Sequence, residues 1–183
     1  MKKKICSWFF RKELAELHNE LETQYRIKHN TLHTQMLINE KRFGIVKRIF
    51  SLFPEAEIIG IAKNKLQDEL LIAINNNEYL YLFGEKYQGI TNLPRIIFRI
   101  NDDQGSKWLY IDDVQMVDDN IGNGTVAMKE LIKYAKKIKA NHIEGSLSCV
   151  DDDHADRRNH YYKKFGFEIE KSKIRLNLDD TNR

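Results

Sequence analysis

The first fifty residues carry a helical pattern of apolar and polar positions. Residues 10–50 contain no proline and one glycine, Gly44, and they are rich in the helix-forming residues Glu, Lys, Leu and Gln. Apolar side chains recur along this stretch at helical spacing, at Leu14, Leu17, Leu21, Tyr25, Leu32 and Met36. A second helical piece is predicted over residues 43–53, because Pro54 disfavours helical geometry in the residue before it. We therefore predict a helical extension over residues 1–54.

The sequence leaves the partner of this extension open. Its apolar positions need a partner, because an isolated helix with an exposed apolar stripe is marginal in water. The heptad repeat is not sustained over three or four heptads, which leaves a coiled coil as one interpretation among others. The helices can pack on the domain that follows them or pair with a second copy of the chain, and we favour the homodimer.

The pattern changes to that of β-strands after residue 55. Short apolar runs rich in β-branched residues alternate with turn-forming residues, which predicts a meander of antiparallel strands. The strands are expected at residues 57–63, 70–74, 79–83, 94–100 and 107–117. Three consecutive asparagines at 75–77 provide a turn between two of them, because asparagine tolerates left-handed backbone geometry.

From residue 118 onward, helices and strands alternate. We expect helices at residues 125–139 and 153–165 and strands at residues 142–148 and 167–176. Gly166 takes the usual position of a glycine after a helix end. A strand–helix–strand connection implies a parallel strand pair with a right-handed crossover. The predicted fold class is therefore α/β (α+β), with a mixed, mostly antiparallel sheet flanked by helices in one domain over residues 55–183.

Composition narrows the classes of protein to consider. With 183 residues and a formal net charge of +3, the chain can bury one core and shows no excess charge that would imply a nucleic-acid partner. The two cysteines, Cys6 and Cys149, lie far apart and lack metal-site spacing, which indicates free thiols in a reducing cytoplasm. No stretch approaches the roughly 20 apolar residues of a membrane-spanning helix. We predict a cytoplasmic protein without a bound metal or a membrane span.

A glycine-containing loop joins the strand ending at Val117 to the following helix. Gly122 and Gly124 allow the backbone to turn sharply and to come close to a ligand. The first amides of a helix have no partner within the helix and, together with the helix dipole, they attract anions. A strand, a Gly-Asn-Gly turn and a helix in this order suit a pyrophosphate, and the same order also occurs as a simple tight turn.

Three segments together resemble the GNAT superfamily of acyl-CoA-dependent N-acetyltransferases. The loop at 122–124 is similar to the family's acyl-CoA pyrophosphate loop, and residues 128–137 are similar to the helix after it. Residues 161–167, Tyr-Tyr-Lys-Lys-Phe-Gly-Phe, are similar to the family's Tyr-x-x-x-Gly-Phe ending. The resemblance covers about residues 56–177 and is strongest over 108–170. It implies a GNAT-like fold and an enzyme that transfers the acetyl group of acetyl-CoA, as cosubstrate, to an amine of a small molecule or a protein.

The resemblance also implies roles for particular residues. The pantetheine arm of the cosubstrate would pair with the strand before the loop, along Val114, Gln115 and Met116. The pyrophosphate would lie against Ile121, Gly122, Asn123, Gly124 and Thr125. Asn159 could hydrogen-bond the pantetheine or a phosphate. Tyr162 stands at the position of the family's general acid, which protonates the departing CoA thiolate; its alternative role is that of a core aromatic, and Tyr161 is expected to pack.

The loop departs from the family pattern at one position. The family's Arg or Gln falls on Asp119 or on Ile121, depending on the alignment, and the loop is about two residues shorter. Backbone amides could still bind the pyrophosphate, whereas an acidic Asp119 would weaken binding unless its side chain caps the helix. This departure favours an alternative function, a catalytically silent acyl-CoA-binding module whose helical extension contacts a partner.

Two further points stay open on the sequence alone. The general base is either water or an acid on or beside the central strands, where the candidates are Asp112, Asp113, Asp118 and Glu144. The charged cluster Asp151–Arg158 could position a cationic acceptor, or it could be a solvated helix start. No residue pattern identifies the acceptor amine.

Overall fold

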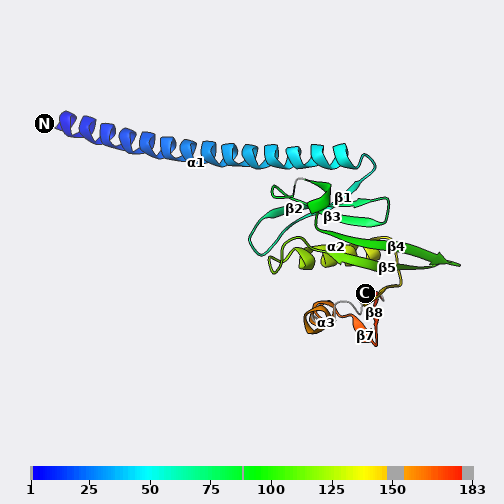
Figure 1. Ribbon diagram of the computed structural model, residues 1–183. Helices are drawn as coiled ribbons and strands as arrows, with labels where there is room; N and C mark the ends of the chain where they lie inside the picture. Colours follow the sequence, from blue (N-terminus) through cyan, green and yellow to red (C-terminus); the bar gives the residue numbers. More distant parts are fainter. Residues whose placement is uncertain (1, 88, 148–154, 179–183) are drawn as a thin grey trace. The chain divides into compact units, whose positions relative to one another are not determined.

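The chain divides into two units in the computed structural model, Met1–Gly44 and Ile45–Arg183 (Figure 1). The structure describes residues 2–87, 89–147 and 155–178, with side chains described from Phe10 onward. The charged residues 151–154 and Cys149 lie outside the described residues.

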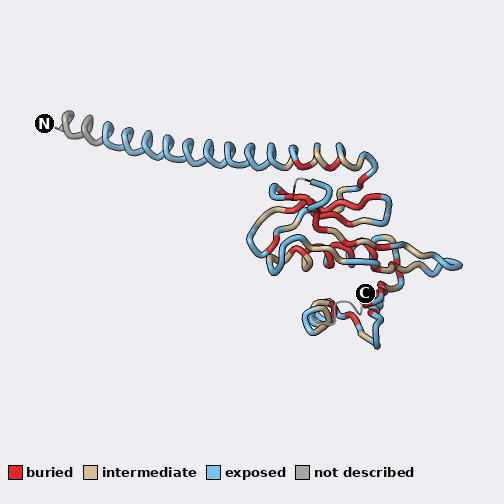
Figure 2. The backbone as a smooth tube through the Cα atoms, in the orientation of Figure 1, coloured by how far each residue is buried: buried red, intermediate tan, exposed pale blue. Residues whose placement is uncertain are grey.

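The N-terminal part of the chain is a single helix, α1 (Lys2–Leu52), 51 residues long. It ends just before Pro54, as predicted, but the prediction of a separate helical piece over 43–53 is wrong because the helix continues through Gly44. A glycine inside a helix costs only about 1 kcal/mol relative to alanine, so it does not by itself end one. Residues 10–41 of α1 are all exposed (Figure 2).

The second unit is built on a mixed sheet. Its eight described strands are β1 (Glu57–Lys63), β2 (Glu69–Asn75), β3 (Tyr79–Phe83), β4 (Arg95–Asp103), β5 (Ser106–Gln115), β6 (His142–Ser146), β7 (Glu168–Glu170) and β8 (Lys173–Asn177). They lie in the order β1-β2-β3-β4-β5-β6-β8-β7, and every pair is antiparallel except β5 and β6, which are parallel. The predicted fold class, a mixed and mostly antiparallel sheet with helices, is confirmed.

One element at the end of the chain differs from the prediction. The single strand expected over 167–176 is a hairpin of β7 and β8. The turn between them includes Lys171 at φ 54°, a left-handed conformation that lysine rarely adopts. Because the turn lacks the glycine or asparagine that usually marks such geometry, the sequence showed one uninterrupted strand.

Helical segments cover both faces of the sheet. On one face lies α2 (Asn123–Lys137), whose Tyr134 ring meets the Phe98 ring edge-on with centroids 6.0 Å apart. On the other face, Phe53 stacks on Tyr81 at 4.8 Å, and the last turns of α1 bury Ile45 and Ile49. Leu80 pairs with Ile96, whose side chain is on the same face of the sheet as that of Phe98. Side chains alternate along a strand, so Tyr81, the residue after Leu80, points to the opposite face.

Two shorter helical elements complete the second unit. A 3-10 turn, Ile90–Asn92, lies between β3 and β4, and α3 (Ala155–Lys163) precedes β7. Buried residues concentrate in the sheet and α2 (Figure 2). Across the described ranges, no helix combines the length and the apolar character that crossing a membrane requires. Within the same ranges, no three or more His, Cys, Asp or Glu side chains gather as metal ligands would.

Candidate functional site

The two parallel strands at the centre of the sheet pair along only part of their length. β5 pairs with β6 from Trp108 to Ile111, and its last residues, Asp112–Gln115, have no partner on β6 in the part of the chain that the structure describes. A bulge in β5 at this point places Ile111 and Asp113 opposite consecutive residues of β4. Beyond β6, the amide of Leu147 donates to Ser172 O at 2.7 Å, so the chain there follows the β8 side. The two strands therefore separate after Ile111.

Gly145 sets the place where the strands are closest. A Cβ atom at Gly145 would lie 2.9 Å from the carbonyl oxygen of Ile111, a contact too short for any side chain. The glycine thus allows β6 to approach β5 directly before the separation begins. A close contact followed by a bulge gives a fixed opening at the end of β5.

A cleft of about 560 Å³ occupies this opening. It is lined by the end of β5, by the loop that follows, by the first turn of α2, by Ser146 and Leu147 after β6, and by one side of α3. A volume of this size is within the usual range of small-molecule sites. The cleft therefore joins the separated strand ends to the N-terminus of α2.

The loop before α2 turns at Gly122, which is the N-cap residue and has φ 92°. A Cβ atom on Gly122 would lie 2.9 Å from Cγ of Lys65 and 3.2 Å from its amide nitrogen. That amide donates to Ile121 O at 2.8 Å, so the loop is fastened to the turn between β1 and β2. The glycine that we expected to admit a ligand is thus required by the turn itself, and the carbonyl of Ile121 faces Lys65.

The first turn of α2 is open to an anion. Gly122 has no side chain with which to cap the helix, and the first turn of α2 contains no acidic residue. The residues of that turn, Asn123, Gly124 and Thr125, line the cleft. Helix N-termini carry partial positive charge, which a neighbouring acid usually balances. The nearest acids of the cleft are in the preceding loop, where Asp118 accepts from Tyr87 and Asp119 pairs with Arg157.

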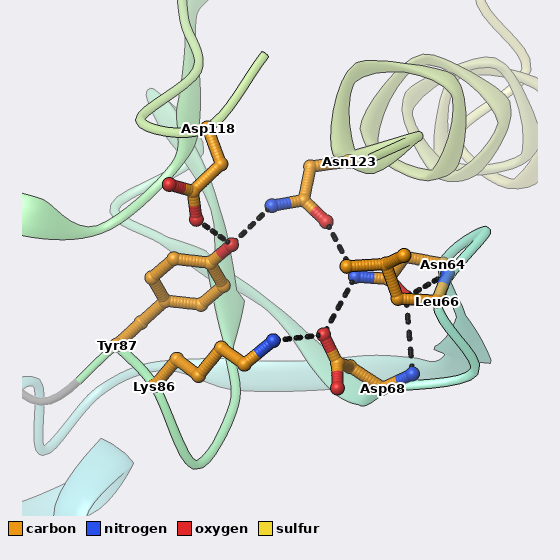
Figure 3. Close-up of polar contacts among 7 residues, drawn as sticks. All are labelled: Asn64, Leu66, Asp68, Lys86, Tyr87, Asp118 and Asn123. Carbon is orange, nitrogen blue, oxygen red and sulfur yellow. Dashed lines mark hydrogen bonds and ion pairs between the residues drawn. The ribbon is translucent and has the colours of Figure 1, made fainter. Parts of the chain in front are cut away.

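Asn123 holds this turn in place from inside the protein (Figure 3). Its side chain is 1% exposed; the amide nitrogen donates to the hydroxyl of Tyr87, and the amide oxygen accepts from Asn64 Nδ2 at 3.2 Å. The hydroxyl of Tyr87 in turn donates to Asp118 Oδ2 at 2.7 Å. Asn123 borders the cleft as predicted, but its side-chain amide is engaged in this network.

The network joins three segments that are distant in sequence, residues 64–68, 86–87 and 118–123. Asn64 Oδ1 accepts hydrogen bonds from the backbone amides of Leu66 and Asp68. Asp68 Oδ2 accepts a hydrogen bond from Lys86 Nζ at 2.8 Å. Burial, and then the hydrogen bond to Asp118, raise the pKa of Tyr87 to about 12. The neutral phenol is therefore the stable form that fixes the loop to the helix start.

Tyr161 holds the same turn from the α3 side. Its hydroxyl donates to Gly124 O at 2.8 Å, and a Cβ atom on Gly124 would lie 3.2 Å from its ring. Burial raises the pKa of Tyr161. Gly124 is thus explained by the close approach of an aromatic ring, and Tyr161 packs as the sequence suggested.

Tyr162 of α3 is buried beside the cleft. Its side chain is 8% exposed, and its ring makes edge-on contacts with Tyr161 at 5.2 Å and with Phe167 at 5.5 Å. Tyr162 also lines the cleft. It is therefore both a core aromatic and a cleft residue, so that packing fixes the direction of its ring.

Cations reach the N-terminus of α2 from other parts of the chain. Lys164 Nζ lies 3.1 Å from Thr125 Oγ1, and Lys65 lies beside Gly122. Asp119 forms an ion pair with Arg157 at 2.8 Å. Lys164 thus brings its ammonium group to the first turn of α2, and Lys65 places its backbone amide and the stem of its side chain beside Gly122. The sequence did not reveal these lysines, because they are 57 and 39 residues away from the loop positions that they approach.

The remaining predicted residues divide into two groups. Val114 and Met116 line the cleft, as expected for the end of β5. Gln115, Ile121 and Asn159 are not among the residues that line it. Oε1 of Gln115 accepts a hydrogen bond from Arg95 Nε at 2.8 Å, and its Nε2 donates one to Asp113 Oδ2. These two bonds explain why the side-chain amide of Gln115 does not line the cleft. Oδ1 of Asn159 is buried and has no hydrogen-bond partner among the residues that the structure describes.

The acids near the cleft are already engaged. Asp112 forms an ion pair with Arg99 at 2.6 Å, and Asp113 accepts the amide of Val114 at 2.8 Å. Both residues line the cleft, as does Asp118. Glu144 lies 3.5 Å from His142 and is not among the lining residues. Asp112, Asp113 and Asp118 are thus the candidate bases that border the cleft.

Neither a protein-family model nor a curated protein matches the chain. The chemistry of the cleft is therefore argued from its own geometry.

Proposed function

We propose that the protein is an acyl-CoA-dependent N-acetyltransferase that transfers the acetyl group of acetyl-CoA to an amine. The observation that carries the proposal is the cleft, which begins where β5 and β6 separate and ends at a helix N-terminus without an acidic cap. A ligand with an amide-containing arm and a pyrophosphate matches both ends. The resemblance of the loop and of residues 161–167 to the GNAT superfamily supports the same ligand.

The residues of the chain suit the two parts of this cosubstrate. The edge of β5 over Asp112–Gln115 has no β6 partner in the described chain, and an amide-bearing arm can pair with such an edge. The amide of Val114 donates to Asp113, so the arm would pair with the other backbone groups of this edge or displace that bond. The first turn of α2 with Lys65 and Lys164 offers amides and cations for the pyrophosphate. Since Asp119 is paired with Arg157, its charge is offset at the rim.

The reaction needs few groups from the protein. The amine nitrogen attacks the thioester carbonyl, a C–N bond forms, and the C–S bond breaks as the tetrahedral intermediate collapses. Tyr162 donates its proton to the departing thiolate, since it lines the cleft, its ring is held against Phe167, and it stands at the general-acid position of the family that the chain resembles. The other tyrosine of the cleft, Tyr161, donates its hydroxyl to Gly124 O instead. The amine loses its proton to water or to Asp113 at the rim.

The acceptor is an amine of a small molecule or a protein, and the reaction takes place in the cytoplasm. The helical extension has no part in this chemistry, and its homodimer contact is a separate proposal. A catalytically silent acyl-CoA-binding module remains the second candidate, favoured by the absence of a loop Arg or Gln.

An acetyl-transfer assay on a panel of amines tests the function. The protein is incubated with acetyl-CoA and with polyamines, free amino acids, aminoglycosides and lysine-containing peptides, and the release of CoA thiol is followed. We expect at least one amine to raise thiol release above the amine-free rate, with the Tyr162→Phe protein as the matched control. If CoA binds and no amine is acetylated, the silent module is the correct function.

A further inference from the structure

Ser146 is the first residue of β6 beyond the last pair with β5. That pair joins Ile111 to Gly145, and the two strands separate after it. Ser146 is exposed and lines the cleft, while its backbone still pairs with Lys173 of β8. The serine is therefore held on a strand at the place where the opening begins.

A hydrogen bond from the neighbouring strand fixes the hydroxyl of Ser146. The hydroxyl of Tyr110 on β5 donates to Ser146 Oγ at 2.8 Å. Arg99 on β4 lies over the Tyr110 ring, with its guanidinium carbon 4.8 Å from the ring centroid, and it donates two hydrogen bonds to Asp112. Ser146 is thus connected through its side chain to β5 and, through Tyr110, to β4.

The bond from Tyr110 leaves Ser146 with a proton to donate. A serine hydroxyl has one proton and two lone pairs. Because Tyr110 is the donor, it occupies one lone pair of Ser146 Oγ and leaves the serine proton for a second acceptor. A hydroxyl that accepts one hydrogen bond donates the next one more strongly, since hydrogen bonds in a chain polarise one another.

We propose that the Ser146 hydroxyl stabilises the carbonyl oxygen of the thioester during acetyl transfer, an inference that rests on the proposed function. As the amine nitrogen bonds to the carbonyl carbon, one electron pair of the C=O bond moves onto the oxygen, and it returns when the C–S bond breaks. A donor at this oxygen lowers the barrier because the oxygen carries more negative charge in the transition state than in the thioester.

The direction of the cosubstrate in the cleft brings the thioester to Ser146. The pyrophosphate meets the first turn of α2, and the arm leads away from it along the end of β5. Followed back from Met116 to Asp112, this edge ends at the last pair of β5 with β6, where the opening closes. The reactive end of the arm therefore lies beside the first residues after that pair, Asp112 on β5 and Ser146 on β6.

The other hydroxyls of the cleft are engaged or have another task. Within the described residues, four of the side chains that line the cleft carry a hydroxyl, Thr125, Ser146, Tyr161 and Tyr162. Thr125 accepts from Lys164 at the start of α2, and Tyr161 donates to Gly124 O. Tyr162 is the donor to the departing thiolate. Ser146 is thus the hydroxyl that is left for the carbonyl oxygen.

Two backbone amides beside the opening are engaged as well. The amide of Val114 donates to Asp113 Oδ1 at 2.8 Å, and the amide of Leu147 donates to Ser172 O at 2.7 Å. Either amide would have to give up its bond to reach the thioester. Ser146 can donate to the thioester and keep its bond from Tyr110.

Turnover of Ser146 variants, on an amine that the wild type acetylates, tests the role. Ser146→Ala should lower kcat by about 10²–10³, the usual loss when one donor to the oxyanion is removed, with the Kd for CoA changed less than threefold. Ser146→Thr keeps the hydroxyl and should retain at least a tenth of the wild-type kcat. Circular dichroism checks that each variant is folded.

Ser106→Ala is the matched control for these variants. Ser106 is also exposed and also accepts a side-chain hydrogen bond, from Asn141 Nδ2 at 3.0 Å. It lies at the other end of β5 and is not among the residues that line the cleft. We expect its kcat to equal that of the wild type.

Tyr110 is a positioning residue, because it acts through Ser146. Tyr110→Phe should lower kcat by about tenfold, since the serine keeps its own hydroxyl and loses only the bond that directs it. The double variant Tyr110→Phe with Ser146→Ala should have the kcat of Ser146→Ala alone, because the two residues act as one unit. Losses that multiply in the double variant would contradict this connection.

The infrared band of the thioester carbonyl tests the contact without turnover. Acetyl-CoA with a ¹³C label at the carbonyl carbon is bound to each protein in the absence of amine. A hydrogen bond weakens the C=O bond, so we expect the band at lower wavenumber in the wild type and in Ser106→Ala than in Ser146→Ala.

The outcomes separate this inference from the proposed function. Equal band positions in the wild type and Ser146→Ala, or a Ser146→Ala protein with wild-type kcat, would overturn the role of Ser146 and leave the transferase in place. A protein that does not bind acetyl-CoA, or that binds it and acetylates no amine, would overturn the proposed function and this inference with it.

Discussion

The hydroxyl of Tyr161 donates a hydrogen bond to the carbonyl oxygen of Gly124 at 2.8 Å, and so connects α3 to the first turn of α2. The two residues are 37 positions apart, and each explains the other. A side chain at Gly124 would crowd the ring of Tyr161, which lies 3.2 Å from the place of its Cβ atom, and Tyr161 is half-buried against this turn. The proposed pyrophosphate site is thus held from outside by α3 and from inside by Asn123.

Removing the Tyr161 hydroxyl should cost stability. Tyr161→Phe keeps the ring and deletes a half-buried hydrogen bond, which lowers the free energy of unfolding by about 0.5–1.5 kcal/mol. Urea denaturation measures this change. The matched control is Tyr110→Phe, which deletes an exposed hydrogen bond to Ser146 and should cost less. Equal costs for the two variants would contradict the structural role given to Tyr161.

Asn123 should be more costly to replace than an exposed asparagine. Asn123→Ala leaves Tyr87 and Asn64 each without one partner inside the protein, and an unsatisfied buried group costs about 1–3 kcal/mol. Asn92→Ala, at an exposed position of the 3-10 turn, is the control and should change stability little. Chemical denaturation of both proteins checks the prediction, and a neutral Asn123→Ala would refute it.

The raised pKa of Tyr87 predicts a loss of stability at high pH. Its pKa is about 12 in the folded chain against 10.0 for the free side chain, because burial and the bond to Asp118 favour the neutral phenol. The resulting stabilisation is complete below about pH 10 and is lost as the pH rises towards 12. We therefore expect the difference in unfolding free energy between wild type and Tyr87→Phe to shrink over this window. A constant difference from pH 9 to 12 would contradict the assignment.

Tyr162→Phe tests the proposed proton donor. The substitution keeps the ring contacts with Tyr161 and Phe167 and removes only the hydroxyl. On an amine that the wild type acetylates, turnover should fall by about 10²–10⁴, the usual contribution of a general acid. CoA affinity, measured by calorimetry on the same protein, should change less than threefold. Turnover close to that of the wild type, with chemistry shown to be rate-limiting, would remove Tyr162 from the mechanism.

The sequence predicted those parts of the fold whose signals are local. Strands such as 57–63 and 79–83 were placed correctly because short apolar runs end in turn-forming residues. The start of α2 was placed two residues late, since glycine at position 124 suggested loop although it is tolerated in a first helical turn. The turn at Lys171 was missed because lysine is not a turn-forming residue.

The site was less predictable, because its contacts join distant parts of the chain. Asn123 was assigned to the ligand from its place between two glycines, whereas its partners Asn64 and Tyr87 lie 59 and 36 positions away. No local pattern signals such pairings. Lys65 and Lys164 were missed for the same reason.

Calorimetric titration of CoA into the full chain tests the central claim most directly, because the cosubstrate site carries the proposed function. We expect saturable one-to-one binding, at least tenfold weaker for Lys65→Ala with Lys164→Ala, which removes both cations beside the first turn of α2. Lys136→Ala, exposed in the last turn of the same helix, is the control and should bind as the wild type does. The absence of binding heat at millimolar CoA, or equal affinity in all three proteins, would contradict the account.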